Sequence, residues 1–186
     1  MQRDWALKHG FEIAKKINDC GGVLSCLVFK TSSEYFIENQ KDVKFEHIIK
    51  DSVIEKNFEE IINKSNYDFV KFKNDFNVDK IWEHAATLRR YSLSYDKKYP
   101  YSYQQNVNDN EIFKYILAFA HEISSAFKKF KPDLVIGYNF GDLRHFLINK
   151  LCDKNKIPFF CSSGTKVSGN ACFAYDFNGD KSFFKN

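Results

Sequence analysis

The chain lacks long apolar runs and dense runs of basic charge. In its 186 residues no apolar stretch approaches the roughly 20 residues that a membrane-spanning helix needs. The first residues, Met1 to Trp5, lack the apolar segment of a signal peptide. The net charge is only +4, and no five basic residues stand together. We therefore expect no nucleic-acid partner and no transmembrane segment, and a place in the cytoplasm or on the periphery of the inner membrane.

Several signatures of metal and nucleotide chemistry are also missing. The five cysteines form no C-x-x-C pair, which favours buried thiols in a reducing compartment and predicts no metal site. Neither a G-x-G-x-x-G loop nor a P-loop is present, so nothing indicates a dinucleotide or Walker-type site. No G-x-S-x-G elbow supports a serine hydrolase.

Helix and strand patterns alternate in the N-terminal part of the chain. Apolar spacing and β-rich runs predict a helix over 4–18, a strand over 23–29, a short helix capped by Ser32 or Ser33 that runs to Asn39, and a strand over 45–49. This alternation is typical of a parallel α/β sheet. A helical and aromatic insert is expected over about 51–109, with five tyrosines between Tyr91 and Tyr103 in a surface loop or an excursion over a cleft.

The strongest pattern lies between residues 110 and 161. An amphipathic helix is predicted over 110–130, with Asn110 as its N-cap and Pro132 as its stop. A strand over 133–137, a helix from Leu143 to Asn155 and a strand over 157–161 then predict a right-handed βαβ crossover. We therefore predict one Rossmann-like α/β domain with an open parallel sheet over 1–163, followed by a hairpin or linker over 164–186.

Ligands of open α/β sheets bind at the carboxyl ends of the strands, and two such ends carry polar residues. After the first strand come Asn139, Asp142, Arg144 and His145, at a helix N-terminus that suits an anion. The alternative is that Asp142 or Asn139 only caps the helix, that Arg144 pairs with a surface carboxylate, and that His145 is solvated.

The second strand end offers Ser163, Thr165 and Lys166, which could hold a sugar or phosphate or form a solvated turn. His84 stands ahead of Arg89 and Arg90, either as a general base or as part of a polar surface face.

One stretch of the chain resembles a known family. The string Phe130-Lys-Pro-Asp-Leu-Val-Ile-Gly-Tyr-Asn, the helix that carries Arg144, and Asn155-Lys-Ile-Pro-Phe-Phe are similar to the N-terminal domain of bacterial capsule and surface-polysaccharide glycosyltransferases of the GT-B kind. The resemblance implies an acceptor-side domain for a glycan or lipid-linked sugar, with Asn139, Asp142, Arg144 and Lys166 positioning the acceptor. It also implies a nucleotide-sugar donor held by a separate or missing domain, which a partner chain could supply, and no cofactor in this chain.

The chain departs from the family pattern in two places. It begins at a helix where the family begins with a strand, and it has no room for the donor-binding domain. Two other readings therefore remain open. One is a non-catalytic sugar- or protein-binding remnant that uses Tyr91 to Tyr103 as a contact surface, and the other is a Rossmann-like enzyme of the nucleotide-sugar epimerase kind.

Overall fold

The computed structural model describes residues 9–88, 107–137, 142–164 and 171–174. Helices alternate with strands that pair in parallel, so the predicted α/β class is confirmed. The chain divides into two compact units, unit 1 (Met1–Asn57) and unit 2 (Phe58–Asn186). Each unit is described by itself below.

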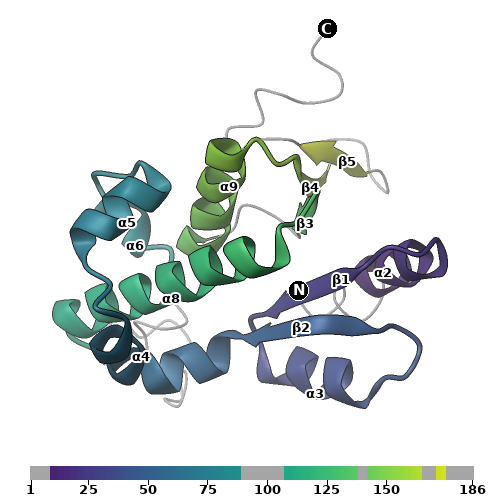
Figure 1. Ribbon diagram of the computed structural model, residues 1–186, viewed down its shortest axis with the longest axis horizontal. Helices are drawn as coiled ribbons and strands as arrows, with labels where there is room; N and C mark the ends of the chain where they lie inside the picture. The colour runs from purple at the N-terminus through teal and green to yellow at the C-terminus, as the bar shows by residue number, and fades with distance from the viewer. Residues whose placement is uncertain (1–8, 89–106, 138–141, 165–170, 175–186) are drawn as a thin grey trace, which may run out of the picture. The chain divides into compact units, whose positions relative to one another are not determined.

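Unit 1 is built on one parallel pair of strands. Its elements are α2 (Gly10–Asp19), β1 (Leu24–Val28), α3 (Thr31–Asn39) and β2 (Phe45–Lys50) (Figure 1). β1 and β2 run parallel with Val28 opposite Lys50, and both α2 and α3 contact β1. Both predicted strands are thus confirmed, and with α3 they form a βαβ unit.

The predicted cap of α3 is wrong. Lys30 occupies the N-cap position in an extended conformation, without a side-chain capping bond. Ser33 lies one turn further on, inside the helix, and is buried. The Lys30 carbonyl oxygen accepts hydrogen bonds from the N–H groups of Ser33 and Glu34, at 2.9 Å each. The helix therefore begins after Lys30, and no serine hydroxyl caps it.

The described part of the predicted insert contains three helices joined by short connections. α4 (Asp51–Ser65) leads from unit 1 into unit 2 and is interrupted at Asn57, whose φ of −121° and ψ of 16° are not helical. The N-cap of α5 (Phe69–Phe76) is Asp68, whose side chain accepts a hydrogen bond from the Lys71 N–H at 2.8 Å. α6 covers only the four residues Trp82–Ala85. The tyrosine-rich stretch from Tyr91 to Tyr103 lies outside the described residues.

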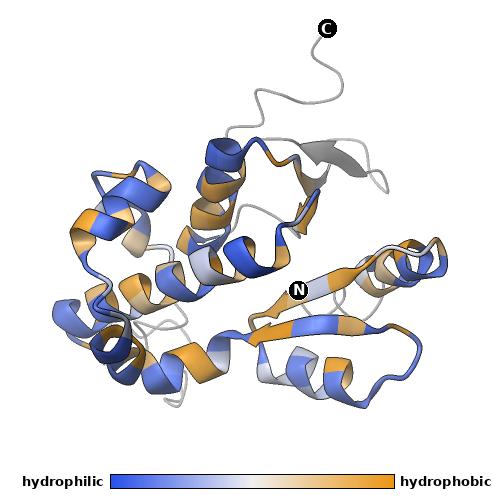
Figure 2. Cartoon of the chain, viewed as in Figure 1, coloured by the Kyte–Doolittle hydropathy of each residue, from blue (hydrophilic) through white to orange (hydrophobic). Residues whose placement is uncertain are grey.

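The longest helix, α8 (Asp109–Phe130), has a capping box at its start. The Asn108 side chain accepts from the Glu111 N–H at 2.9 Å, and the Glu111 carboxylate accepts from the Asn108 N–H at 2.8 Å. The N-cap is therefore Asn108, and the predicted N-cap, Asn110, is wrong because it lies two residues further on, inside the helix. Apolar and polar residues alternate along α8 in Figure 2, and Tyr115 and Ala118 on its apolar side are fully buried.

The predicted crossover in unit 2 is present as a parallel strand pair. β3 (Val135–Gly137), α9 (Leu143–Asn155) and β4 (Phe159–Gly164) follow one another, with Gly137 opposite Cys161. A Cβ atom on Gly137 would lie 2.8 Å from Cζ of Phe159, so a larger residue at position 137 would require the Phe159 ring to shift. β5 (Ala171–Ala174) pairs antiparallel with β4, with Gly164 opposite Ala171.

The core of unit 2 lies where α5, α8 and α9 pack together. Its most buried side chains include aromatic rings from α5 and α8 and an aliphatic residue from α9: Phe72, Phe76, Tyr115, Phe119 and Leu147. No helix in the described part of the chain is long and apolar enough to cross a bilayer.

Candidate functional site

A group of polar side chains lies where β3 ends and α9 begins. Asp142 is the N-cap of α9, and its Oδ1 accepts from the N–H groups of Arg144 at 3.0 Å and His145 at 3.4 Å. Aspartate is a preferred N-cap because its carboxylate satisfies N–H groups that have no partner within the helix. The carboxyl end of a parallel strand is also the usual ligand position of an α/β sheet.

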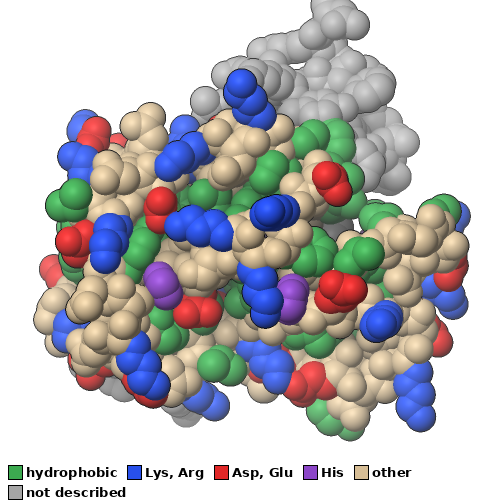
Figure 3. Space-filling view, in the orientation of Figure 1, with side chains coloured by type: hydrophobic (Ala, Val, Ile, Leu, Met, Phe, Trp, Pro, Cys, Tyr) green, Lys and Arg blue, Asp and Glu red, His purple; other side chains and the backbone are tan. Residues whose placement is uncertain are grey.

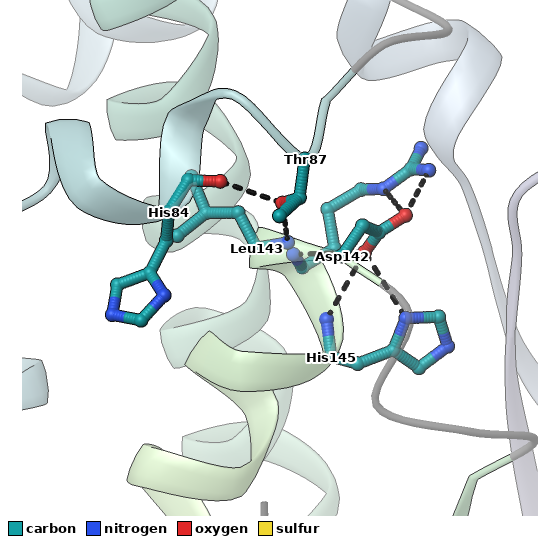
Figure 4. A network of polar contacts seen from close by, with 6 residues as sticks. His84, Thr87, Asp142, Leu143 and His145 are labelled. Atoms are coloured by element: carbon teal, nitrogen blue, oxygen red, sulfur yellow. Dashed lines mark hydrogen bonds and ion pairs between the residues drawn. The ribbon is translucent and has the colours of Figure 1, made fainter.

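The same carboxylate binds two side chains, which gives the Asp142–Arg144–His145 cluster. The Arg144 guanidinium donates to Oδ2 of Asp142 from Nε at 3.1 Å and from Nη2 at 2.5 Å. The Nδ1 atom of His145 lies 3.0 Å from Oδ1 (Figure 4). All three side chains are less than one-tenth exposed. A fork of two bonds to a buried carboxylate holds its orientation more firmly than a surface pair would.

The protonation state of Asp142 follows from two opposing effects. Burial by itself would raise the pKa of the carboxyl group, because it disfavours the charged form. The hydrogen bond from His145 and the positive charge of Arg144 outweigh burial and hold the pKa of Asp142 well below its ordinary value. The carboxylate is therefore ionised at neutral pH and balances the charge of Arg144.

The hydrogen bond between Asp142 and His145 determines which imidazole nitrogen of His145 can accept a proton. A carboxylate next to Nδ1 favours the tautomer with its proton on that nitrogen, and the lone pair then lies on Nε2. An imidazole oriented in this way can accept a proton at Nε2, while the carboxylate stabilises the imidazolium that forms. The cluster thus has the parts of a general base, a partner that orients it, and a guanidinium that fixes this partner.

Two residues of the α6 region support the start of α9. The Leu143 N–H donates to Oγ1 of Thr87 at 2.8 Å, and the Thr87 hydroxyl donates to the His84 carbonyl at 2.6 Å (Figure 4). The His84 ring stacks on Phe146 with 3.9 Å between centroids. The His84 side chain is thus half-buried, with one face of its ring against Phe146.

The structure brings three of the predicted site residues together and places a fourth in a strand. Asp142, Arg144 and His145 are brought together, and Asp142 caps the helix as the structural alternative held. The other two parts of that alternative are wrong, because Arg144 pairs with the buried Asp142 and His145 is buried rather than solvated. Ser163 lies in β4, opposite Cys172 of β5. The remaining predicted site residues, Asn139, Thr165 and Lys166, lie outside the described part of the chain.

Thr87 was missed by sequence reasoning. Its hydroxyl contributes through a contact 56 residues away in the chain, and a lone threonine after a short helix carries no recognisable pattern. The partnership of Asp142 with His145 could have been found, because an Asp at an N-cap and a His three residues later lie on the same helical turn.

Two buried cysteines of unit 2 are poor nucleophiles because their thiols stay protonated. Burial raises the pKa of the Cys161 thiol to about 12, and burial with the nearby charge of Asp153 does the same for Cys152. Among the described residues, no three or more His, Cys, Asp or Glu side chains are placed to hold a metal ion. On the face drawn in Figure 3, Lys and Arg side chains are interspersed with Asp and Glu rather than gathered in one stripe.

Comparisons with known proteins add no further lead. No model of a known protein family matches the chain, and no curated protein or solved structure resembles it significantly.

Proposed function

We propose that this chain is a glycosyltransferase-like, acceptor-side domain of surface-polysaccharide biosynthesis, which works with a separate donor-binding domain. The observation that carries the proposal is the 3.0 Å contact between the Asp142 carboxylate and Nδ1 of His145 at the carboxyl end of β3. A buried, oriented imidazole at that position suits the activation of a hydroxyl group. Acceptors of sugar transfer react through a hydroxyl, which links the site to this class of reaction.

The proposed step balances in protons and electrons. The acceptor hydroxyl gives its proton to Nε2 of His145 as its oxygen attacks the anomeric carbon of the donor sugar. The bond from that carbon to the diphosphate oxygen breaks, and the nucleoside diphosphate leaves with the bonding electrons. Asp142 stabilises the imidazolium through Nδ1, and Arg144 is a positioning residue because it holds Asp142. Stabilisation of the diphosphate falls to the donor-binding domain.

The proposal includes a fold with an open parallel sheet. Each unit contributes one βαβ crossover with parallel strands, β1–α3–β2 and β3–α9–β4. Such crossovers are the repeating element of doubly wound sheets. We therefore propose a Rossmann-like open parallel sheet as the complete fold.

The proposal is tested by ligand binding to the full chain. Calorimetry with a short-chain analogue of a lipid-linked diphosphosugar is expected to show binding, whereas UDP-sugars alone are expected to bind weakly. Arg144→Ala is expected to weaken binding of the diphosphosugar roughly tenfold or more, since it removes a buried cation and the hold on Asp142. His9→Ala, a change at an exposed histidine, serves as the control. Absence of acceptor binding, or tight binding of UDP-sugars by the chain alone, would contradict the proposal.

A non-catalytic binding domain is the second candidate. Both oxygens of the Asp142 carboxylate are already bound by side chains of its own helix, which favours a structural clamp. The two candidates separate in a transfer assay with the donor-binding partner added. His145→Gln retains a polar side chain but cannot serve as a base, so it is expected to abolish transfer if His145 is the base. Full transfer by the variant would favour the clamp.

A further inference from the structure

The α6 region is attached to the first turn of α9 at two points. The Leu143 N–H donates to Oγ1 of Thr87 at 2.8 Å (Figure 4), and the His84 ring stacks on Phe146. On each side the two residues are three apart in the chain, which is the spacing of neighbours on one side of a helical turn. Both attachments therefore hold the same turn of α9, the turn that carries His145.

The Asp142 carboxylate in this turn has no capacity for a further donor. Its Oδ1 accepts from the N–H groups of Arg144 and His145 and lies 3.0 Å from Nδ1 of His145. Its Oδ2 accepts from Nε and Nη2 of Arg144. An ionised carboxylate offers about four lone-pair positions, and these contacts fill them. The carboxylate therefore cannot also serve the N–H of Leu143.

Thr87 supplies the acceptor that Asp142 cannot provide. The N–H groups at the start of a helix have no carbonyl partner within that helix. In α9, Asp142 serves those of Arg144 and His145, and Thr87 serves that of Leu143. The Thr87 hydroxyl spends its own proton on the backbone carbonyl at position 84, at 2.6 Å, so it meets Leu143 as an acceptor.

Loss of the Thr87 hydroxyl would act on His145 through Asp142. The part-buried Leu143 N–H would be left without its acceptor, and an unmade bond of this kind costs more than the bond itself contributes. The Asp142 carboxylate, one residue away in the chain, is the acceptor for which this N–H would then compete. Any movement of the carboxylate toward Leu143 lengthens its contact with Nδ1 of His145, which is the contact that selects the imidazole tautomer.

We propose that Thr87 is a positioning residue for the His145 imidazole, because its hydroxyl occupies the Leu143 N–H and so keeps the Asp142 carboxylate on Nδ1. The inference stands apart from the transfer reaction proposed above, since the tautomer of His145 is a property of the chain itself. Thr87 is exposed, so its hydroxyl can be removed without opening a cavity in the core.

The test records the histidine ring nitrogens of the full-length, ¹⁵N-labelled chain by NMR at pH 8. The His145 signals are assigned by their absence in His145→Gln. The proton of the wild-type ring is expected on Nδ1. Thr87→Val keeps the shape of the side chain without the hydroxyl, and it is expected to lower the ratio of the Nδ1–H to the Nε2–H tautomer roughly threefold or more. A wild-type ratio in Thr87→Val would overturn the proposal, even if the variant were less stable.

A rescue variant and a matched control make the assignment specific to the hydroxyl. Thr87→Ser retains the hydroxyl and is expected to restore the wild-type ratio. Thr31→Val makes the same change at an exposed threonine in unit 1, at the start of α3, and is expected to leave the ratio unaltered. A ratio in Thr87→Ser as low as in Thr87→Val, or an equal fall in Thr31→Val, would contradict the role given to the hydroxyl.

Amide hydrogen exchange checks the underlying bond in the wild-type chain, without relying on any variant. The Leu143 N–H is expected to be protected, because it is bonded to Thr87. In Thr87→Val its exchange should accelerate roughly tenfold, whereas the Phe146 N–H, which donates to the Asp142 carbonyl at 3.2 Å, should keep its rate. A wild-type Leu143 N–H that exchanges as fast as an unbonded amide would overturn the proposal.

Discussion

Asp142 and His145 form a buried pair in which one carboxylate both caps a helix and fixes an imidazole ring. The 3.0 Å contact to Nδ1 and the capping bond to the His145 N–H use the same oxygen, Oδ1. Position and tautomer of the histidine are therefore tied to the start of α9. A change at residue 142 acts on the helix and on the imidazole together, which shapes the first prediction.

Replacing Asp142 by Asn is expected to destabilise unit 2 by roughly 3–5 kcal/mol at neutral pH, because it leaves Arg144 buried without its counter-ion. The pKa of Asp142 is lowered in the folded state from its ordinary 3.8, so the carboxylate contributes stability above that pH and loses it as the pH falls further. The difference between wild type and variant should thus be constant above about pH 5 and shrink below 3.8.

The measurement is urea unfolding at pH 7 and pH 3, followed by Trp82 fluorescence in a Trp5→Phe background. Asp153→Asn is the matched control, since Asp153 is exposed on the same helix. An equal loss of stability at both pH values would show that the charge of Asp142 has no part in holding unit 2 together.

The start of α8 offers a choice between two neighbouring asparagines. Asn108→Ala is expected to cost about 1 kcal/mol of stability, because it removes one half of the capping box. Asn110→Ala is expected to be neutral or slightly stabilising, since alanine favours helix interiors. Equilibrium unfolding of both variants compares them directly, and a larger loss for Asn110→Ala would place the cap where the sequence alone suggested it.

The contact between β3 and β4 at Gly137 predicts a suppressor pair. Gly137→Ala would bring a methyl group to 2.8 Å from Cζ of Phe159, whose ring is buried, and is expected to cost about 1–3 kcal/mol. Phe159→Leu shortens that side chain, so the double variant should lose less stability than the sum of the single losses. Thermal unfolding of the four proteins gives the coupling energy, and strict additivity would mean that the two residues do not meet.

The thiols are expected to differ widely in reactivity. Cys20 is exposed, whereas burial raises the pKa of Cys26, Cys152 and Cys161 to about 12 each. In a Cys172→Ser background, a chromogenic disulfide reagent at pH 8 should therefore label one thiol quickly and three slowly. Rapid labelling of a second thiol in the native protein would show that unit 1 or unit 2 opens more readily than its packing implies.

Local patterns in the sequence predicted the elements better than their ends or partners. The strands β1 and β2 and the crossover through α9 follow from apolar runs and from turns at Gly21-Gly22 and Pro132, which act within a few residues. The N-cap of α8 was misplaced because Asn108 and Asn110 stand close together and only the capping bonds distinguish them. The N-cap of α3 was misplaced because the helix begins after Lys30, a residue with no capping preference, rather than after a serine.

The burial of the site residues could not be predicted from the sequence, because it depends on tertiary packing. Arg144 and His145 look like surface residues in isolation, and they are buried because unit 2 packs around α9 while Asp142 neutralises the guanidinium.

The burial of α9 has a consequence for how unit 2 would meet a ligand. Nine of the thirteen residues of α9 are buried, among them every residue from Leu143 to Asn149. The rotamers of Arg144 and His145 are thus fixed by packing, and their conformational entropy is lost when the protein folds rather than when a ligand arrives. A molecule bound at His145 would meet a preorganised surface, so its affinity would depend on its own shape and flexibility more than on rearrangement of the helix.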